Sequence, residues 1–298
     1  MKISQAFLLQ LFLILSSTCG VIDRQTAKIP GYNLLTPDER TILPEPLHEI
    51  SAMTLISPSA FACIEDEDGI LFVYDFVKKE IIRQTVFWGR GDYEGITRVN
   101  DTIYVLRSDG MIFEISQYQS DTPKVTLIPT GIPQSDNEGL CYDEANRRLL
   151  ITCKEYIGKG SKTIFKRVIF GFDLKTRLLT DKPVYRFDLR DIINFAADHN
   201  MHFQIEPKKG KHKAENILKF HPSDLAINST TGRIYILSGV DNTLGVFNKD
   251  GRIENFVILD PALFNQAEGI IFLSNGDMLI SNEGGNGSPT LLRFNYRK

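Results

Sequence analysis

The chain has 298 residues, of which 42% are hydrophobic and 24% charged, and its 34 Lys and Arg against 37 Asp and Glu give a formal net charge of −3. This composition excludes a disordered chain, a collagen-like fibre and a disulfide-stapled miniprotein. A general nucleic-acid binder would be more basic, so no nucleic-acid partner is expected. The length is enough for one large β domain or two ordinary domains.

Residues 1–18 are predicted to be a signal peptide. Lys2 gives a positive start, and a mostly apolar run extends from Ala6 to Leu15. About ten helical residues span roughly 15 Å, half of the hydrocarbon core, so this run is too short to cross a membrane. A buried N-terminal helix is the alternative. Residues 19–31 would form a tether before the folded domain.

Small residues precede Cys19, a pattern that resembles a bacterial lipobox. In such a sequence the cysteine is lipidated and becomes the new N-terminus. The expected location is therefore the bacterial cell envelope, with membrane contact through a lipid anchor only, and simple secretion is the alternative. Cys63, Cys141 and Cys153 remain, and an odd number cannot form a complete disulfide framework. Buried thiols are expected, although a Cys141–Cys153 pair stays open.

A repeat of about 44 residues indicates the architecture. Five segments start with an acidic residue and continue with β-branched or aromatic runs separated by turns. The aligned acids lie 45, 44, 86 and 44 residues apart, at Glu49, Glu94, Glu138, Asp224 and Glu268. A period near 44 is typical of one four-stranded propeller blade, whereas a two-sheet sandwich would not repeat in this way. The sequence therefore predicts an all-β fold, a single β-propeller of four-stranded blades over residues 32–298.

The 86-residue gap leaves two blade counts open. Residues 188–220 lack an acid-Gly-Ile start and carry an amphipathic helical pattern at Leu189, Ile192, Ile193 and Ala196. Five blades with an insertion at about 188–220 are preferred to six. The last repeat has only three strand-like runs, so the segment from Tyr32 to Leu43 is predicted to supply its fourth strand and close the ring.

Five motifs occur in a fixed order along nearly the whole mature chain: LPEPLHEIS at 43–51, GDYEGI at 91–96, DNEGL at 136–140, HPS at 221–223 and ISNEG at 280–284. Together they resemble the SdiA-regulated protein family. The resemblance implies an exported or membrane-associated bacterial β-propeller, similar to NHL-type and esterase-like phytase propellers. It implies a fold far more than an activity.

The candidate site is one mouth of the central channel, because the first strand of each blade lines the axis of a propeller. The five aligned acids open these strands and are expected to converge there. Two carboxylates about 5 Å apart repel by roughly 3 kcal/mol at an effective dielectric near 20. Hard oxygen ligands without a Cys/His cluster favour Ca²⁺, so a Ca²⁺ ion held by Glu49, Glu94, Glu138, Asp224 and Glu268 is one hypothesis. Protonation, pairing with Arg107 or Lys154, or backbone hydrogen bonds from the next blade are the alternatives.

Two functions follow from this site. In the first, the protein binds an unidentified small molecule or envelope protein without turnover; the candidate ligand-binding residues are Arg107, Lys154, His48, His221, Asn282 and Glu283. In the second, it is a calcium-dependent hydrolase of esters or phosphoesters, phytase-like or lactonase-like, with His48 or His221 as general base. No nucleophile–base pair can be identified from the sequence. Binding is preferred, because a fold analogy does not establish a reaction.

Overall fold

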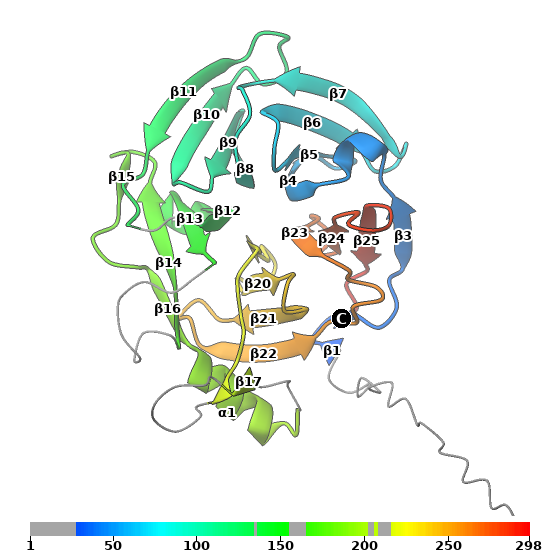
Figure 1. Cartoon of the computed structure of the whole chain (residues 1–298), viewed down its shortest axis with the longest axis vertical. Helices are drawn as coiled ribbons and strands as arrows, with labels where there is room; N and C mark the ends of the chain where they lie inside the picture. The colour runs from blue at the N-terminus through cyan, green and yellow to red at the C-terminus, as the bar shows by residue number, and fades with distance from the viewer. Residues whose placement is uncertain (1–27, 134–135, 155–164, 202–205, 208–215) are drawn as a thin grey trace, which may run out of the picture.

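Five antiparallel sheets surround a central axis in this computed structural model, which describes residues 28–133, 136–154, 165–201, 206–207 and 216–298 (Figure 1). Four of these sheets are formed by strands that follow one another in the sequence, and the fifth adds the N-terminal strand β3 (Glu39–Ile42) to three C-terminal strands. The prediction of an all-β, five-bladed propeller is confirmed, and the six-bladed alternative is wrong.

The blades follow one another in sequence order around the ring. Blade 1 contains β4 (Ile50–Ser57), β5 (Ala60–Glu65), β6 (Ile70–Asp75) and β7 (Glu80–Val86). Blade 2 contains β8 (Tyr93–Val99), β9 (Thr102–Arg107), β10 (Met111–Ser116) and β11 (Lys124–Pro129). Blade 3 contains β12 (Asn137–Asp143), β13 (Arg148–Cys153) and β14 (Lys166–Asp173), with β15 (Leu178–Leu179) and β16 (Tyr185–Asp188) both paired to β14. Blade 4 contains β19 (Asp224–Ile227), β20 (Ile234–Ser238), β21 (Thr243–Phe247) and β22 (Ile253–Ile258). Blade 5 contains β23 (Ala267–Phe272), β24 (Met278–Asn282), β25 (Thr290–Phe294) and β3 (Glu39–Ile42).

Apolar layers between neighbouring blades form the core. The middle strands are buried on both faces, whereas the outer strand β7 alternates between exposed and half-buried residues along most of its length. One such layer joins blades 4 and 5 through Tyr235, Leu244, Ile280 and Phe294. Each buried side chain of this size contributes roughly 1.5–3 kcal/mol, so the contact between blades is what fixes the ring.

The N-terminal strand β3 closes the ring, as predicted. It pairs antiparallel with β25, with Ile42 opposite Thr290 and Glu39 opposite Arg293 (Figure 1). A short hairpin of β1 (Lys28–Ile29) and β2 (Tyr32–Asn33) precedes it, and the Tyr32 hydroxyl donates to the Gly276 carbonyl at 2.5 Å. Blade 5 is therefore built from both ends of the chain.

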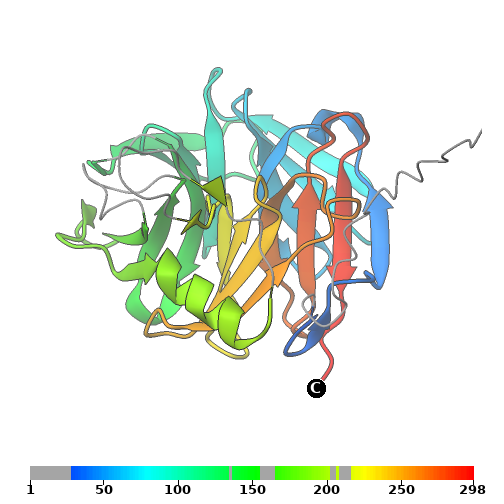
Figure 2. The same cartoon turned by 60° about the horizontal axis from the view of Figure 1, so that its bottom comes forward.

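The insertion carries the helix α1 (Leu189–Asp198), which lies on the outside of the propeller (Figure 2). Its apolar face buries Leu189, Ile192 and Ala196 against β16 and β22. Two short paired strands, β17 (Glu206–Pro207) and β18 (Asn216–Ile217), follow. The turns η1 (Glu45–Leu47) and η2 (Glu144–Asn146) are single 3₁₀ turns. Within the described ranges, no helix is long and apolar enough to span a membrane.

Candidate functional site

Three glutamates occupy equivalent bulges at the start of the inner strands of blades 2, 3 and 5. The pairing of β8 with β9 slips between Tyr93 and Gly95, and that of β23 with β24 slips between Ala267 and Gly269. The same slip occurs in β12 next to Glu138. A bulge re-aims the extra side chain away from the regular ladder. We call Glu94, Glu138 and Glu268 the bulge glutamates, and the end of the channel where they lie the axial mouth.

Two of the glycines that follow the bulge glutamates are required by the packing of neighbouring inner strands. A Cβ atom on Gly95 would lie 2.7 Å from the backbone oxygen of Glu138 on the next blade, and one on Gly139 would lie 2.9 Å from the Cα atom of Asp224. Both distances are shorter than real Cβ contacts allow. The Glu-Gly pair therefore combines a re-aimed carboxyl group with a close backbone approach.

Two of the five aligned acids are not equivalent to the others, which corrects the sequence alignment. In blade 1 the bulge falls between Ile50 and Ala52, so Ser51 takes the bulge position and Glu49 lies before it. In blade 4 no bulge occurs, and Asp224 pairs regularly with Leu237. Asp224 thus occupies the position of the glycines, one residue deeper in the channel than a bulge glutamate.

Lys154 is the cation of the axial mouth. It follows β13, and its Nζ atom lies 3.0 Å from Oε1 of Glu138, whose side chain is only 4% exposed. Burial alone would lower the pKa of Lys154, but attraction to Glu138, Glu94 and Glu268 outweighs it and raises the pKa. One ammonium group therefore faces all three bulge glutamates, and pairs directly with one.

The remaining glutamates of the axial mouth are held partly or fully protonated at neutral pH. Burial, followed by repulsion from Glu138, raises the pKa of Glu94 to about 9. Burial and repulsion from Glu283 raise the pKa of Glu268 to about 8. The pKa of Glu283 rises to about 7, through burial and then the charges of Glu49 and Asp66. Two of the predicted ways to reduce repulsion between the carboxylates, protonation and pairing with lysine, thus both occur at the axial mouth.

The other predicted ligand-binding residues of blades 2 and 5 have structural partners. Arg107 binds Asp109 through two hydrogen bonds, at 3.1 and 2.7 Å, and does not neutralise Glu94. Asn282 is fully buried, and its amide donates to the Leu263 carbonyl and to the Thr290 hydroxyl. Glu283 accepts a hydrogen bond from the Gln266 side chain.

The two candidate histidines differ in their surroundings. His48 packs against Gly284, and its Nε2 atom lies 3.2 Å from the Gly285 carbonyl and 3.5 Å from Glu49. His221 instead places its Nδ1 atom 2.9 Å from Oδ2 of Asp241. Asp241, in the turn after β20, was not among the predicted site residues. The sequence could have indicated it, because His221 and Asp241 both lie next to strand ends of blade 4 that face the axial mouth.

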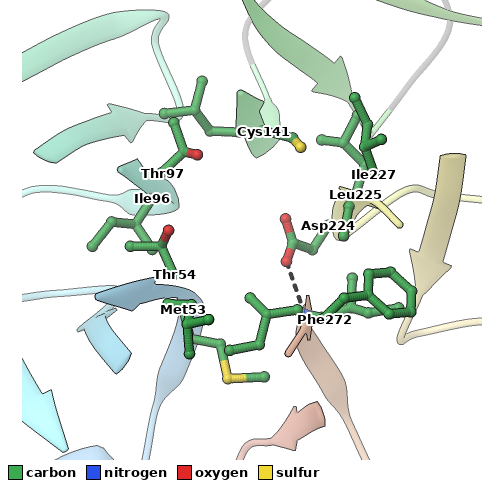
Figure 3. A pocket seen from close by; sticks show the side chains of 14 residues that line it. Met53, Thr54, Ile96, Thr97, Cys141, Asp224, Leu225, Ile227 and Phe272 are labelled. Atoms are coloured by element: carbon green, nitrogen blue, oxygen red, sulfur yellow. Dashed lines mark hydrogen bonds between the residues drawn. The ribbon is translucent and has the colours of Figure 1, made fainter. Parts of the chain in front are cut away.

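Asp224 lies inside the channel, in a cavity of about 160 Å³ lined by all five inner strands (Figure 3). Its Oδ2 atom accepts the backbone N–H of Ile270 on the next blade at 2.9 Å. Thr54 and Thr97 make the same kind of contact, accepting the N–H groups of Arg98 and Tyr142 on the blades that follow them. Burial raises the pKa of Asp224 well above its ordinary value. Asp224 is therefore one of a series of side chains that join neighbouring blades.

No group of three or more His, Cys, Asp or Glu side chains in the described residues is arranged to hold a metal ion. Cys63, Cys141 and Cys153 are free thiols, so the open Cys141–Cys153 pair does not form. Cys19 lies outside the described residues. Ca²⁺ binding stays a prediction.

Comparison with known proteins supports the fold. No family model matches the chain, and no curated protein matches its sequence. A glutaminyl cyclase from Myxococcus xanthus is similar in structure, with a TM-score of 0.57 and 11% identity over 88% of this chain and 97% of that one. A streptogramin B lyase gives a TM-score of 0.47 with 12% identity over 87% of each chain. At its low identity, the likeness to the glutaminyl cyclase shows the fold and no activity, and the resemblance to the SdiA-regulated family stays a prediction.

Proposed function

We propose that this protein binds a positively charged ligand at the axial mouth. The observation that carries the proposal is the imbalance of titratable groups: three bulge glutamates lie around one ammonium group, Lys154, which is hydrogen-bonded only to Glu138 within the described part of the chain. Glu283, Glu49 and Asp66 add further acid beside them. Glu94 and Glu268 are mostly protonated at neutral pH, and a cation that approaches them favours the loss of those protons, so such a mouth accepts a cation more readily than an anion.

Binding would exchange protons for the ligand. Glu94 and Glu268 have raised pKa values because burial and mutual repulsion disfavour their charged forms. A bound cation favours those charged forms, so it should release protons from the mouth, and its affinity should rise with pH up to about 9. Ca²⁺ and an organic ammonium ion are the two ligand types that fit; Ca²⁺ needs about 6–8 oxygen ligands, which carboxylates and water would supply.

Isothermal titration calorimetry with CaCl₂ and, separately, choline chloride tests the proposal. We expect heat of binding and proton release for at least one of the two, measured at pH 7 in buffers of different ionisation enthalpy. Glu94→Gln should weaken binding by about tenfold or more, which corresponds to about 1.4 kcal/mol. Glu80→Gln is the control, because Glu80 is exposed on the outer strand β7. No heat with either cation would contradict the proposal.

The cellular setting of the proposal rests on the leader sequence. We propose export to the bacterial cell envelope with a lipid on Cys19, which would place the axial mouth before small molecules or envelope proteins. Cys19→Ser should release soluble protein or leave uncleaved precursor. Identical fractionation of variant and wild type would contradict the lipid and leave simple secretion.

A further inference from the structure

Asp241 contacts both the backbone and the imidazole ring of His221. Its Oδ2 atom accepts hydrogen bonds from the backbone N–H of His221 at 2.8 Å, from the hydroxyl of Ser238 at 2.7 Å, and faces Nδ1 of the His221 ring at 2.9 Å. The Asp241 side chain is only 9% exposed. Burial opposes ionisation, but the contacts with His221 and Ser238 outweigh it and lower the pKa of Asp241. The acceptor beside the ring is therefore a carboxylate.

A carboxylate at Nδ1 determines which nitrogen of the neutral ring carries the proton. A neutral imidazole has one N–H and one lone pair, and Oδ2 of Asp241 requires the N–H. The lone pair then lies on Nε2. No other described residue forms a hydrogen bond with Nε2, and the side chain is 29% exposed. Among the described residues, His221 is thus an oriented base whose basic atom has no hydrogen-bond partner. His48 offers no accessible basic atom, because its Nε2 atom lies against the Gly285 carbonyl and its Nδ1 atom is buried.

This histidine lies at the edge of the axial mouth. His221 precedes β19, and Ser223, two residues later, donates its hydroxyl proton to the carbonyl of Ala267 at 3.1 Å. Ala267 is the neighbour of Glu268 along β23, and Ser223 also contacts the Glu268 carboxyl group. A ligand attracted by the bulge glutamates would therefore come close to the His221 ring.

Water is the nucleophile that such a base would activate. The Ser238 hydroxyl donates to Asp241 rather than to the ring, so it is not aligned for activation by His221. Burial raises the pKa of the Cys141 and Cys153 thiols to about 12, which leaves them unreactive at neutral pH. Among the described residues no hydroxyl or thiol is hydrogen-bonded to Nε2.

We propose that the axial mouth hydrolyses esters that carry a positive charge, with His221 as the general base and Asp241 as its positioning residue. Nε2 of His221 takes a proton from water, and the water oxygen attacks the ester carbonyl carbon. The tetrahedral intermediate then breaks its bond to the alcohol oxygen, which receives the proton from Nε2. The products are one carboxylic acid and one alcohol, so atoms and electrons balance without a further reactant. This inference rests on the proposed binding of a cation at the mouth.

The charge of the mouth selects the substrate class. A phosphoester is an anion, and its hydrolysis depends on cations that stabilise the transferred group. In the described part of the chain the axial mouth presents carboxyl groups and one lysine that is already paired with Glu138, which leaves no lysine there to stabilise the transferred group. An ammonium group would be attracted to the carboxyl groups of the axial mouth. The ester carbonyl is neutral, so it is not repelled by them.

Hydrolysis of acetylcholine, followed by pH-stat titration, tests the inference against two reference substrates. These are 3,3-dimethylbutyl acetate, the uncharged isostere, and p-nitrophenyl phosphate. We expect turnover of acetylcholine at a kcat/KM about tenfold or more above the isostere, equivalent to about 1.4 kcal/mol of charge recognition, and none of the phosphoester. His221→Gln should lower kcat by about a hundredfold with KM unchanged, as loss of a general base requires.

Two further variants separate a catalytic role from a structural one. Asp241→Asn should lower kcat by about tenfold or more while KM and the melting temperature stay close to wild type, because an amide can present a donor to Nδ1 and stabilise the wrong tautomer. His199→Gln is the control, since His199 lies on α1 with its Nδ1 atom bonded to the Phe195 carbonyl at 2.7 Å. Wild-type protein that binds choline but does not hydrolyse acetylcholine would overturn this inference alone. Protein that binds neither choline nor Ca²⁺ would overturn the binding proposal beneath it.

Discussion

Asp224 and Glu138 are buried acids on the neighbouring inner strands β19 and β12, and their surroundings stabilise them in different ways. Asp224 accepts a backbone N–H from the next blade, a partner that is fixed by the sheet itself. Glu138 pairs with Lys154, a flexible side chain that is 36% exposed and is also attracted to Glu94 and Glu268. A backbone partner holds the fold together, whereas an exposed lysine can be displaced by another cation. Burial of an acid therefore does not identify a site, but the nature of its partner does.

Deletion of the closing strand β3 should disrupt the surroundings of both Asp224 and Glu138 and have the largest effect on stability. Deletion of residues 20–46 removes β3, which supplies the fourth strand of blade 5 through its pairing with β25. The ring would then have an open edge at a blade that contacts both of its neighbours. We expect the deletion to abolish cooperative unfolding, measured by circular dichroism during heating. A sharp melting transition in the truncated protein would contradict the role of β3 in closure.

Substitution of Asp224 tests whether its hydrogen bond to the backbone of the next blade stabilises the fold. Asp224→Ala leaves the N–H of Ile270 without its acceptor and enlarges the cavity, so we expect a loss of about 2–3 kcal/mol in the free energy of unfolding. Asp224→Asn keeps an acceptor oxygen and should cost under about 1 kcal/mol. Chemical denaturation measures both. If the asparagine variant were as unstable as the alanine variant, the negative charge itself would matter, as it would for a ligand of Ca²⁺.

Substitution of Lys154 tests how much its ion pair with Glu138 stabilises the protein. Lys154→Met leaves Glu138 buried without its cation, and because Lys154 is partly exposed we expect a loss of about 1–2 kcal/mol rather than the larger cost of a fully buried pair. Adding Glu138→Gln should recover most of that loss in a double-mutant cycle. Lys79→Met is the matched control, since the Lys79–Glu39 pair is exposed at both ends and should contribute little. Equal effects of the two lysine variants would contradict a special role for Lys154.

The pH dependence of stability should show the raised pKa values of the bulge glutamates. Glu94 and Glu268 have folded-state pKa values of about 9 and about 8, above their ordinary value of 4.5. The stability linked to them is therefore complete below about pH 4.5 and is lost as the pH rises through 8 and 9. Glu94→Gln should match wild type at pH 5 and exceed it by at least about 1 kcal/mol at pH 9, about the value of one pKa unit. Parallel stability curves for the two proteins across this range would contradict the raised pKa.

The sequence was enough to predict the ring, because a blade of four strands and three turns requires nearly constant chain length. It also identified Glu94, Glu138 and Glu268, because a glycine follows each of them, and the first two of these glycines lie where two blades approach closely. It misplaced Glu49 and Asp224, since a bulge shifts the ladder by one residue and leaves no mark in the hydrophobic pattern. The pairing of His221 with Asp241 depends on the shape of the turn after β20 and on two side-chain rotamers, neither of which follows from residue spacing.

The closing strand β3 also constrains the order in which the parts of the ring can form. β3 is among the first parts of the fold to be synthesised, whereas its partner β25 comes almost last, on the order of 250 residues later, so closing that loop costs about 5 kcal/mol of chain entropy by its length alone. Blades 1 to 4 can form as each hairpin leaves the ribosome, but the interface of blade 5 with blade 1 must wait for both ends of the chain to meet. Until then the edges of the unfinished ring stay open to other strands, and the last event of folding is also the one that protects the chain from aggregation.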